Sequence, residues 1–244
     1  MPNTPEHWAA LSASAQRIDT ISSDRLLKDN ARNQGLRHSL AGCHFDFTRQ
    51  RVDGQILNEL HELAQRTNLS AKRDAMFSGD KINTSENRGV LHSALRDGAP
   101  RAPSQYRQAV AQTKQRLFTA VDDIRSGNWR GFTNKAIKDV VHIGIGGSHL
   151  GPELVVNALA HLPGSANAPK LHFVANIDAN DISTALVGLN PETTLFIVVS
   201  KSFGTLETQI NAATARSWFL ERTCNPQAIG QHFIGVTTNL EAAA

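Results

Sequence analysis

The chain has 244 residues, of which 40% are hydrophobic, a length and composition that suit a globular protein of one large or two ordinary domains. No apolar run approaches the roughly 18 residues that cross a membrane, and no secretory signal opens the sequence, so we expect a cytoplasmic protein. The net charge is +3, but basic residues are scattered among acidic ones and aromatic residues make up only 6%, which excludes a nucleic-acid-binding stripe.

The first hundred residues predict mainly helices. Residues 3–22 place Pro5 near the start of a segment whose apolar residues recur at helical spacing, as in an amphipathic helix. In the segment 43–53 the first apolar residues alternate with polar ones, which favours an extended piece. A second amphipathic pattern begins at Ile56 and continues to about Asn68.

A capping pair predicts a further helix. Thr84 or Ser85 stands ahead of an apolar pattern that runs through Leu95, and a hydroxyl at a helix start can accept an otherwise unpaired backbone N–H. The prolines of residues 98–104 then interrupt the chain. We therefore expect a helical N-terminal region over residues 1–103 and an α/β domain over residues 104–244.

The second domain alternates helices with short apolar strands. A helix that carries Val110 and Ile124 on one face comes first, and four β-branched apolar runs follow it, separated by helical or turn-rich segments. Such runs are typical of parallel strands that are buried on both faces, so the domain is predicted to contain a doubly wound parallel sheet. The predicted strands are 139–145, 171–177, 194–200 and 233–238.

The stretch 139-DVVHIGIGGSHLGPEL-154 changes from a strand pattern to small residues and then to a helical pattern. Glycines allow a backbone to approach an oxygen-rich ligand closely. The start of the following helix offers unpaired N–H groups and the positive end of its dipole, and Ser148 adds a hydroxyl donor. This first turn is therefore predicted to bind a phosphate.

A second small-residue turn, 200-SKSFGTLET-208, directly follows the third predicted strand. Ser200, Ser202, Thr205 and Thr208 supply hydroxyls, and Lys201 supplies a positive charge. The oxygens of a phosphomonoester accept several short hydrogen bonds from such donors and need no metal. Ligands of open parallel sheets bind beyond the carboxyl ends of the strands, where both turns are expected to lie.

Neither turn matches a nucleotide-binding loop. The glycines of the first turn miss the G-x-G-x-x-G spacing, and no acidic residue follows about 20 residues later, which disfavours a nucleotide-dependent oxidoreductase. The pattern G-x-x-x-x-G-K-[ST] is absent from the sequence. Either turn alone is compatible with an ordinary strand-to-helix connection, but two of them at successive strand ends favour a phosphate site.

Three blocks of the sequence resemble the glucose-6-phosphate isomerase family. They are 76-MFSGDKINTSENRGVLHSALR-96, 142-HIGIGGSHLGP-152 and 200-SKSFGTLET-208, in the family's order, and the resemblance continues to 236-VTTN-239. It implies a sugar-isomerase-type, Rossmann-like α/β fold (the SIS domain), without cofactor or metal. It also implies interconversion of glucose 6-phosphate and fructose 6-phosphate, in glycolysis and gluconeogenesis, through a cis-enediol.

The resemblance also implies roles for individual residues. Glu207 would orient the family's catalytic histidine without taking the substrate proton itself. Ser202 stands where the family more often has threonine, Gly204 replaces a frequent threonine, and Gly89 a frequent alanine; none of these departures removes a donor that the site needs. The residues implied to bind the sugar or its phosphate are Gly147, Ser148, Ser200, Lys201 (through its backbone N–H), Ser202 and Thr205.

The family's catalytic base has no counterpart in this sequence. Family members continue beyond the position of Ala244, and their glycine-arginine signature, glutamate base, ring-opening histidine and late lysine lie in that continuation. Aldose–ketose isomerisation needs a carboxylate base at C1/C2 and a donor near the developing oxyanion. We therefore expect a fragment that holds the phosphate-binding part of a homodimeric isomerase and is inactive alone. A non-catalytic sugar-phosphate-binding module is the alternative.

Other candidate sites are weaker. His142 and His149 flank the first turn, but a histidine on a strand is more often a core residue, and no carboxylate has metal-ligand spacing. Lys201 lacks the desolvated pocket that a Schiff-base lysine needs. Cys43 and Cys224 lie far apart in the sequence and are expected to be free thiols.

Overall fold

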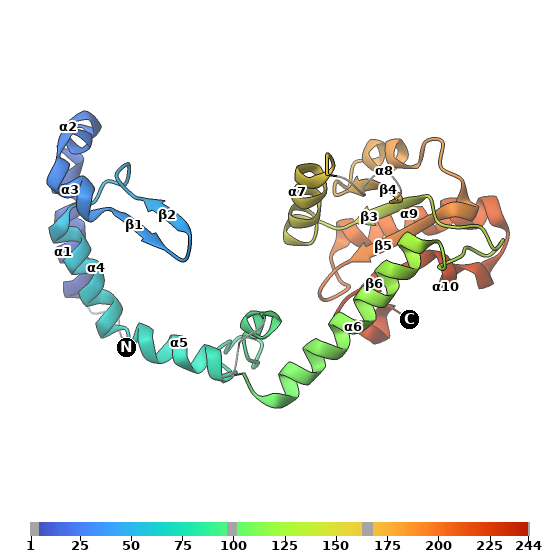
Figure 1. Cartoon of the computed structure of the whole chain (residues 1–244), viewed down its shortest axis with the longest axis horizontal. Helices are drawn as coiled ribbons and strands as arrows, with labels where there is room; N and C mark the ends of the chain where they lie inside the picture. The colour runs from blue at the N-terminus through green and yellow to red at the C-terminus, as the bar shows by residue number, and fades with distance from the viewer. Residues whose placement is uncertain (1–4, 97–101, 163–167, 244) are drawn as a thin grey trace. The chain divides into compact units, whose positions relative to one another are not determined.

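The structure, a computed structural model, describes residues 5–96, 102–162 and 168–243 (Figure 1). The chain forms two compact units, Met1–Ala111 and Gln112–Ala244, and helix α6 (Ser104–Ser126) runs across the boundary between them. The predicted division at residues 103/104 stays a prediction. Among the residues that the structure describes, no helix is long and apolar enough to cross a membrane.

The N-terminal unit consists of short helices and one hairpin. Helix α1 (Pro5–Asp19) contacts α4 (Gly54–Arg66), and both contribute to a small core around Ile18, Leu26 and Ile56. Two helices predicted from the sequence are thereby confirmed, although each ends before the predicted limit. The other elements of this unit are α2 (Ser23–Lys28), α3 (Asn30–Gly35), β1 (Arg37–Leu40), β2 (Cys43–Asp46), α5 (Leu69–Ser78) and the 3₁₀ turn η1 (His92–Leu95).

The extended piece predicted at residues 43–53 is confined to β2. This strand pairs antiparallel with β1, which the sequence did not predict, and Arg37 lies opposite Asp46. Ala41 and Gly42 join the strands with φ values of +50° and +77°, as the favoured two-residue hairpin turns require.

The helix predicted to follow Thr84 or Ser85 is wrong. Asn83 and Arg88 form an isolated antiparallel bridge, and Asn87 has a left-handed φ of +49°, which no α-helix accommodates. The side chain of Asn83 accepts hydrogen bonds from the Ser85 hydroxyl at 2.8 Å and from the Glu86 N–H at 3.2 Å. This local turn competes with a helix for the same backbone groups, and only η1 forms further along. Of the predicted loop 98–104, residues 98–101 lie outside the described part of the chain.

The C-terminal unit contains a parallel sheet in the order β4-β3-β5-β6. The chain passes from β3 to β4 on one side and then returns to β5 on the other side of β3. All four predicted strands are confirmed, and each ends earlier than predicted. Their bounds are β3 (Asp139–Ile143), β4 (Lys170–Val174), β5 (Thr194–Val199) and β6 (Phe233–Val236).

Side chains from helices cover both faces of this sheet, as the doubly wound prediction requires. On one face, Val140 and Leu195 pack with Ile124 of α6 and with Trp129. The other face carries the larger core, in which strand residues meet α8 (Ala179–Leu186) and α9 (Leu206–Thr223). The buried residues of that core are Val141, Ile143, Val174, Ile182, Leu186, Phe196, Val198, Ala215, Phe219 and Ala228.

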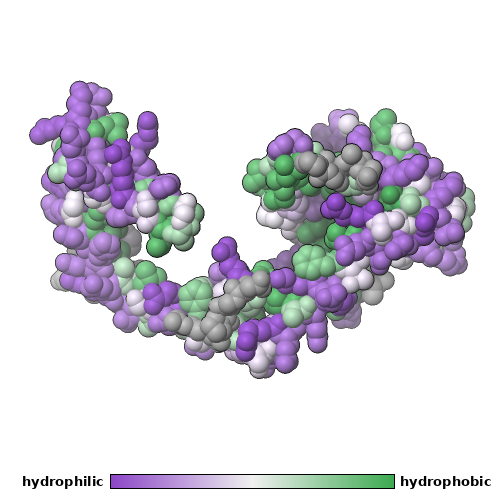
Figure 2. All heavy atoms as spheres, in the orientation of Figure 1, coloured by the Kyte–Doolittle hydropathy of each residue, from purple (hydrophilic) through white to green (hydrophobic). Residues whose placement is uncertain are grey.

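Helix α7 (Leu150–Leu159) contributes no buried side chain to the core. Leu150, Leu154, Val155 and Leu159 are each at least half exposed, and Figure 2 shows apolar side chains gathered on the C-terminal unit where this helix lies. Its N-terminus directly follows the first turn. The remaining short elements are η2 (Gly146–Ser148), η3 (Pro191–Thr193), η4 (Pro226–Ala228), α10 (Ile229–His232) and α11 (Leu240–Ala243).

His232 joins three parts of the C-terminal unit. Its side chain is fully buried, and its Nε2 accepts the N–H of Phe132 at 3.1 Å. Because Nε2 is the acceptor, Nδ1 carries the proton and donates to the Thr194 carbonyl at 2.6 Å. Burial lowers the pKa of His232, although the Thr194 hydrogen bond opposes the shift. The folded protein therefore keeps this imidazole neutral.

We expect the free energy of unfolding to decrease when the pH falls from about 7.5 to about 5.5. The lowered pKa of His232 means that the unfolded chain binds a proton near the ordinary pKa of 6.5, while the folded chain does not. This contribution to stability is complete above pH 6.5 and is lost below it, down to the lowered pKa. Urea unfolding at each pH gives the free energy of unfolding, and its decrease with falling pH should be smaller in His232→Gln. His161→Gln, at an exposed histidine, is the control, and an equal decrease with falling pH in both variants would contradict the prediction.

Candidate functional site

The two predicted turns leave the carboxyl ends of neighbouring strands. β3 and β5 pair in parallel, with Ile143 opposite Val198, so both turns begin at the same edge of the sheet. The backbones approach closely there: a Cβ on Gly144 would lie 3.1 Å from the Ser148 carbonyl oxygen and 3.3 Å from the Val199 carbonyl oxygen. This is the point at which the strand order reverses, and open α/β sheets bind their ligands in this crevice.

The first turn, Gly144–His149, is held from beneath by His142. This histidine of β3 is only 6% exposed, and its Nε2 lies 2.9 Å from the Ser148 carbonyl oxygen. Burial lowers the pKa of His142, with a further lowering from His149 and an opposing effect of the Ser148 hydrogen bond. The neutral ring therefore donates its Nε2–H to that carbonyl. Gly147 has open space where its Cβ would stand.

The second turn, Ser200–Gly204, also has a buried base and an exposed tip. Ser200 is 4% exposed, and its hydroxyl donates to the hydroxyl oxygen of Thr205 at 3.3 Å. Lys201 and Ser202 are exposed. Phe203 adopts a left-handed φ of +55° and packs its ring against the larger core. The turn is thereby anchored on both sides of its exposed residues.

The helices that follow both turns begin without a side-chain cap. Thr205 stands at the N-cap of α9 and His149 at that of α7, but neither side chain accepts a hydrogen bond from the first helical N–H groups. By contrast, Asp178 caps α8 in the same unit, through the N–H of Asn180 at 2.8 Å. The uncapped N–H groups of α7 and α9 are therefore available to an anion.

Unpaired buried atoms gather at the same two helix starts. Within the described ranges, three buried side-chain polar atoms have no hydrogen-bond partner. One is Glu59 Oε2, and the other two are His149 Nδ1 and Thr208 Oγ1, from the N-cap of α7 and the first turn of α9. Because buried polar atoms are nearly always paired, two such atoms beside the turns make this edge of the sheet the candidate functional site.

The structure places the sequence-predicted residues as follows. Gly147 and Ser148 lie in the first turn; Ser200, Lys201 and Ser202 lie in the second, and Thr205 and Glu207 at the start of α9. The assignment of these residues to ligand binding stays a proposal. The hydroxyl of Thr208, in the first turn of α9, belongs to a side chain that is only 3% exposed, so it is buried beside the site.

Three residues that contact the second turn were missed by sequence reasoning. Thr237, Thr238 and Asn239 follow β6 and donate hydrogen bonds to backbone carbonyls of that turn. The available signal was the run of hydroxyl and amide side chains directly after an apolar strand. The two threonines were instead assigned to the end of the strand, because β-branched residues also favour extended structure.

The other histidine and cysteine features show no such convergence. His149 Nε2 lies 3.1 Å from Glu153 Oε2, and the rings of His142 and His149 are 6.4 Å apart. Over residues 5–96, 102–162 and 168–243, no group of three or more histidine, cysteine, aspartate and glutamate side chains could hold a metal ion. Cys43 and Cys224 are exposed free thiols.

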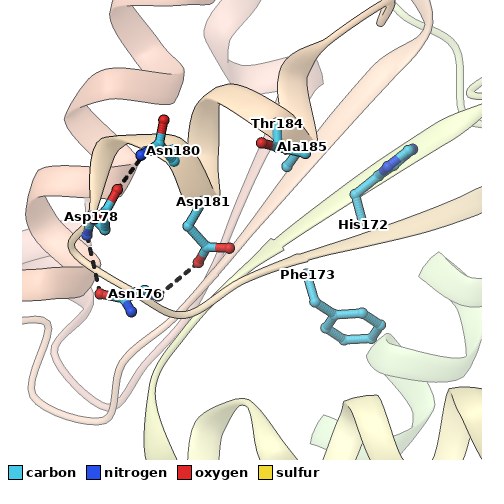
Figure 3. A pocket seen from close by; sticks show the side chains of 8 residues that line it. All are labelled: His172, Phe173, Asn176, Asp178, Asn180, Asp181, Thr184 and Ala185. Carbon is cyan, nitrogen blue, oxygen red and sulfur yellow. Dashed lines mark hydrogen bonds between the residues drawn. The ribbon is translucent and has the colours of Figure 1, made fainter.

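A pocket of about 550 Å³ beside β4 has the wrong charge for a phosphate (Figure 3). Asp181 turns its carboxylate toward the backbone there and accepts the N–H groups of Ala175 and Asn176 at 2.8 and 2.7 Å. Asp178 accepts the N–H of Asn180. Two carboxylates would repel an anionic ligand, and none of the predicted site residues lines this pocket.

A second pocket, of about 590 Å³, lies at the amino ends of β3 and β5. Arg130, Lys135 and Lys138 line it, and Lys135 pairs with Glu192. It is on the edge of the sheet opposite the two turns, so it provides a control for any test of anion binding.

Comparison with known proteins identifies a family that matches most of the chain. The family model described as phosphoglucose isomerase matches residues 46–244. A glucose-6-phosphate isomerase of Shewanella sp. strain MR-4 is 43% identical over 240 residues, which cover 97% of this chain and 44% of that protein. The corresponding protein of Francisella philomiragia is 42% identical over 224 residues, with 90% and 41% covered.

A solved structure shows the same fold. The crystal structure of a glucose-6-phosphate isomerase from Chlamydia trachomatis matches with a TM-score of 0.70 at 27% sequence identity, over 93% of this chain and 44% of that chain. The chain therefore belongs to the phosphoglucose isomerase family and has its α/β sugar-isomerase fold. It spans less than half the length of the curated relatives that it matches.

Two glycine substitutions test the geometry of the first turn. Gly144→Ala should lower the free energy of unfolding by about 1–3 kcal/mol, because the new methyl group would meet two backbone carbonyls at 3.1 and 3.3 Å. Gly147→Ala should change it by less than about 0.5 kcal/mol, because no atom lies within 4 Å of the new group. Urea unfolding of both variants measures the difference, and equal losses would contradict the described packing of the turns.

Proposed function

We propose that this chain binds the phosphate group of glucose 6-phosphate and fructose 6-phosphate and belongs to an enzyme that interconverts them. Membership of the phosphoglucose isomerase family supports this proposal. The observation that carries it is the pair of uncapped helix starts at one point of the sheet, beside a glycine-rich first turn and a hydroxyl-rich second turn. Backbone N–H groups and hydroxyls are donors that a phosphate monoester accepts without a metal.

In this proposal each turn has its own task. Ser200, Ser202 and Thr205, with the N–H of Lys201, hold the phosphate. Gly147 and Ser148 approach the sugar or its phosphate from the first turn. The space at Gly147 and the exposed tip of the second turn leave room for such a ligand.

The isomerisation step needs a carboxylate base and an oxyanion donor for which this sequence offers no candidate. Transfer of a proton between C1 and C2 through a cis-enediol needs a carboxylate base, and the developing oxyanion needs a nearby donor. We place both outside the 244 residues, so the chain alone should be inactive. Glu207, in the first turn of α9, would orient a catalytic histidine that also lies outside them. A cytoplasmic homodimer is proposed for the intact enzyme.

Ligand-dependent unfolding tests the binding part of this proposal. Fructose 6-phosphate at 100 times its Kd should stabilise the folded chain by about 2.7 kcal/mol and raise the midpoint of thermal unfolding. Fructose without the phosphate is the control and should leave the midpoint unchanged, because the proposed donors recognise the phosphate. The absence of any effect of fructose 6-phosphate would sink the proposal.

A coupled isomerase assay on the same preparation tests the catalytic part. We expect binding without turnover. Turnover above background would show that a base lies within the chain, and Glu153→Gln and Glu207→Gln would then identify it.

Substitution of Thr205 tests where the phosphate binds. Thr205→Val removes a hydroxyl that makes no cap bond but accepts the hydroxyl of the buried Ser200. The free energy of unfolding should therefore fall by about 1–3 kcal/mol, and the Kd of the folded chain for fructose 6-phosphate should rise about tenfold or more. A hydrogen bond to a charged group contributes about 1.5–3 kcal/mol. Thr214→Val, on an exposed turn of the same helix, is the matched control. Isothermal titration calorimetry measures the Kd of each variant, and Lys138→Gln in the opposite pocket should bind fructose 6-phosphate as tightly as the unmodified chain. A loss of affinity in Lys138→Gln alone would instead place the phosphate site in that pocket.

A further inference from the structure

We propose that Thr237, Thr238 and Asn239 position the second turn for phosphate binding, by holding its carbonyl groups so that its N–H groups face the ligand. These three residues, which follow β6, are called the 237–239 clamp. They do not belong to the proposed donors; they act through the backbone of the turn. The inference rests on the proposed function and assigns it a further set of residues.

The clamp gathers three donors on one carbonyl. The Lys201 carbonyl oxygen accepts the Thr237 hydroxyl at 3.0 Å and the Thr238 hydroxyl at 2.8 Å. It also accepts the backbone N–H of Thr238 at 3.0 Å. The next carbonyl, that of Ser202, accepts the side-chain amide of Asn239 at 3.2 Å. The two carbonyls at the exposed tip of the turn are therefore both fixed by the clamp.

The clamp is itself held in place. The N–H of Asn239 donates to the Thr237 hydroxyl oxygen at 3.0 Å, and the side-chain oxygen of Asn239 accepts the N–H of Ala242 at 3.1 Å. At the base of the turn, the Ser200 N–H donates to the Val236 carbonyl at 3.1 Å. The clamp therefore fixes the position of the turn relative to the end of β6.

Peptide planarity converts this contact into an orientation of donors. In a trans peptide the C=O and the following N–H point in opposite directions, and no cis peptide occurs among the described residues. Because the clamp binds the Lys201 carbonyl, the N–H of Ser202 points away from the clamp. No described residue accepts that N–H, so it is available to an anion.

Phe203 fixes the far end of the same segment. Its left-handed φ of +55° is costly for a bulky residue, and its ring packs against the larger core, about 3.8 Å from where a Cβ of Gly235 would lie. The N–H of Phe203 donates back to the Ser200 carbonyl at 3.2 Å. With both ends fixed, the conformation of the tip depends on the clamp.

The test removes the two threonine hydroxyls of the clamp with valine, a side chain of the same shape. The double variant Thr237→Val, Thr238→Val deletes two hydrogen bonds to the Lys201 carbonyl, and the double variant Thr237→Ser, Thr238→Ser retains them. Thr223→Val, which removes a hydroxyl-to-carbonyl hydrogen bond of 2.9 Å at the opposite end of α9, is the matched control. Affinity for fructose 6-phosphate and for inorganic phosphate is measured by calorimetry, and backbone amide exchange over residues 200–206 by mass spectrometry.

We expect the double valine variant to bind both ligands about tenfold more weakly or worse and to exchange the amides of residues 200–206 faster. The double serine variant should restore both values, and Thr223→Val should change neither. Unchanged affinity and exchange in the double valine variant would overturn the inference, as would a double serine variant that fails to restore them. If the unmodified chain binds neither ligand, the proposed function fails, and the exchange data still decide whether the clamp orders the turn.

Discussion

The register of β3 against β5 is the constraint on which the rest of the C-terminal unit depends. Because Ile143 lies opposite Val198, two turns that are distant in the sequence leave the sheet side by side. Side chains alternate along a strand, so a shift of one residue would exchange the two faces. Val141 would leave the larger core, and His142 would lose the Ser148 carbonyl. One set of backbone hydrogen bonds therefore determines both the packing of the core and the assembly of the site.

The site is prepared in advance by polar groups that are buried and paired. His142 and Ser200 are both less than 10% exposed, and burial of a polar group is costly unless a partner compensates for it. His142 pairs with the Ser148 carbonyl of the first turn, and Ser200, at the base of the second turn, pairs with the hydroxyl of Thr205 at the N-cap of α9. The groups left unpaired, His149 Nδ1 and Thr208 Oγ1, are at the helix starts. A turn held in this manner loses little further conformational freedom when a ligand binds, which favours affinity.

The sequence was informative where one physical signal dominated. Runs such as 194-TLFIVV-199 had no competing interpretation, and their strands formed, each ending earlier than predicted. The strand Arg37–Leu40 was not predicted, because all four of its residues are exposed and the residues of the turn to its partner β2, Ala41 and Gly42, carry no strong turn signal. The predicted helix after Thr84 failed because the side chain of Asn83 instead accepts the Glu86 N–H and the Ser85 hydroxyl in a local turn. The contacts of Thr238 could not be predicted, because they depend on how β5 and β6 pair.

The division between binding and chemistry follows from the shape of the proposed substrate. The phosphate and the reacting carbons are at opposite ends of a hexose phosphate, so the groups that hold one need not be near those that transform the other. Interactions with a remote, unreactive group can still accelerate a reaction when they position the reacting atoms. Such positioning is effective only if the phosphate site is rigid relative to the sheet. The hydrogen bonds from His142 and from the 237–239 clamp join each turn directly to a strand or its end, and this is the property that such a division of labour requires.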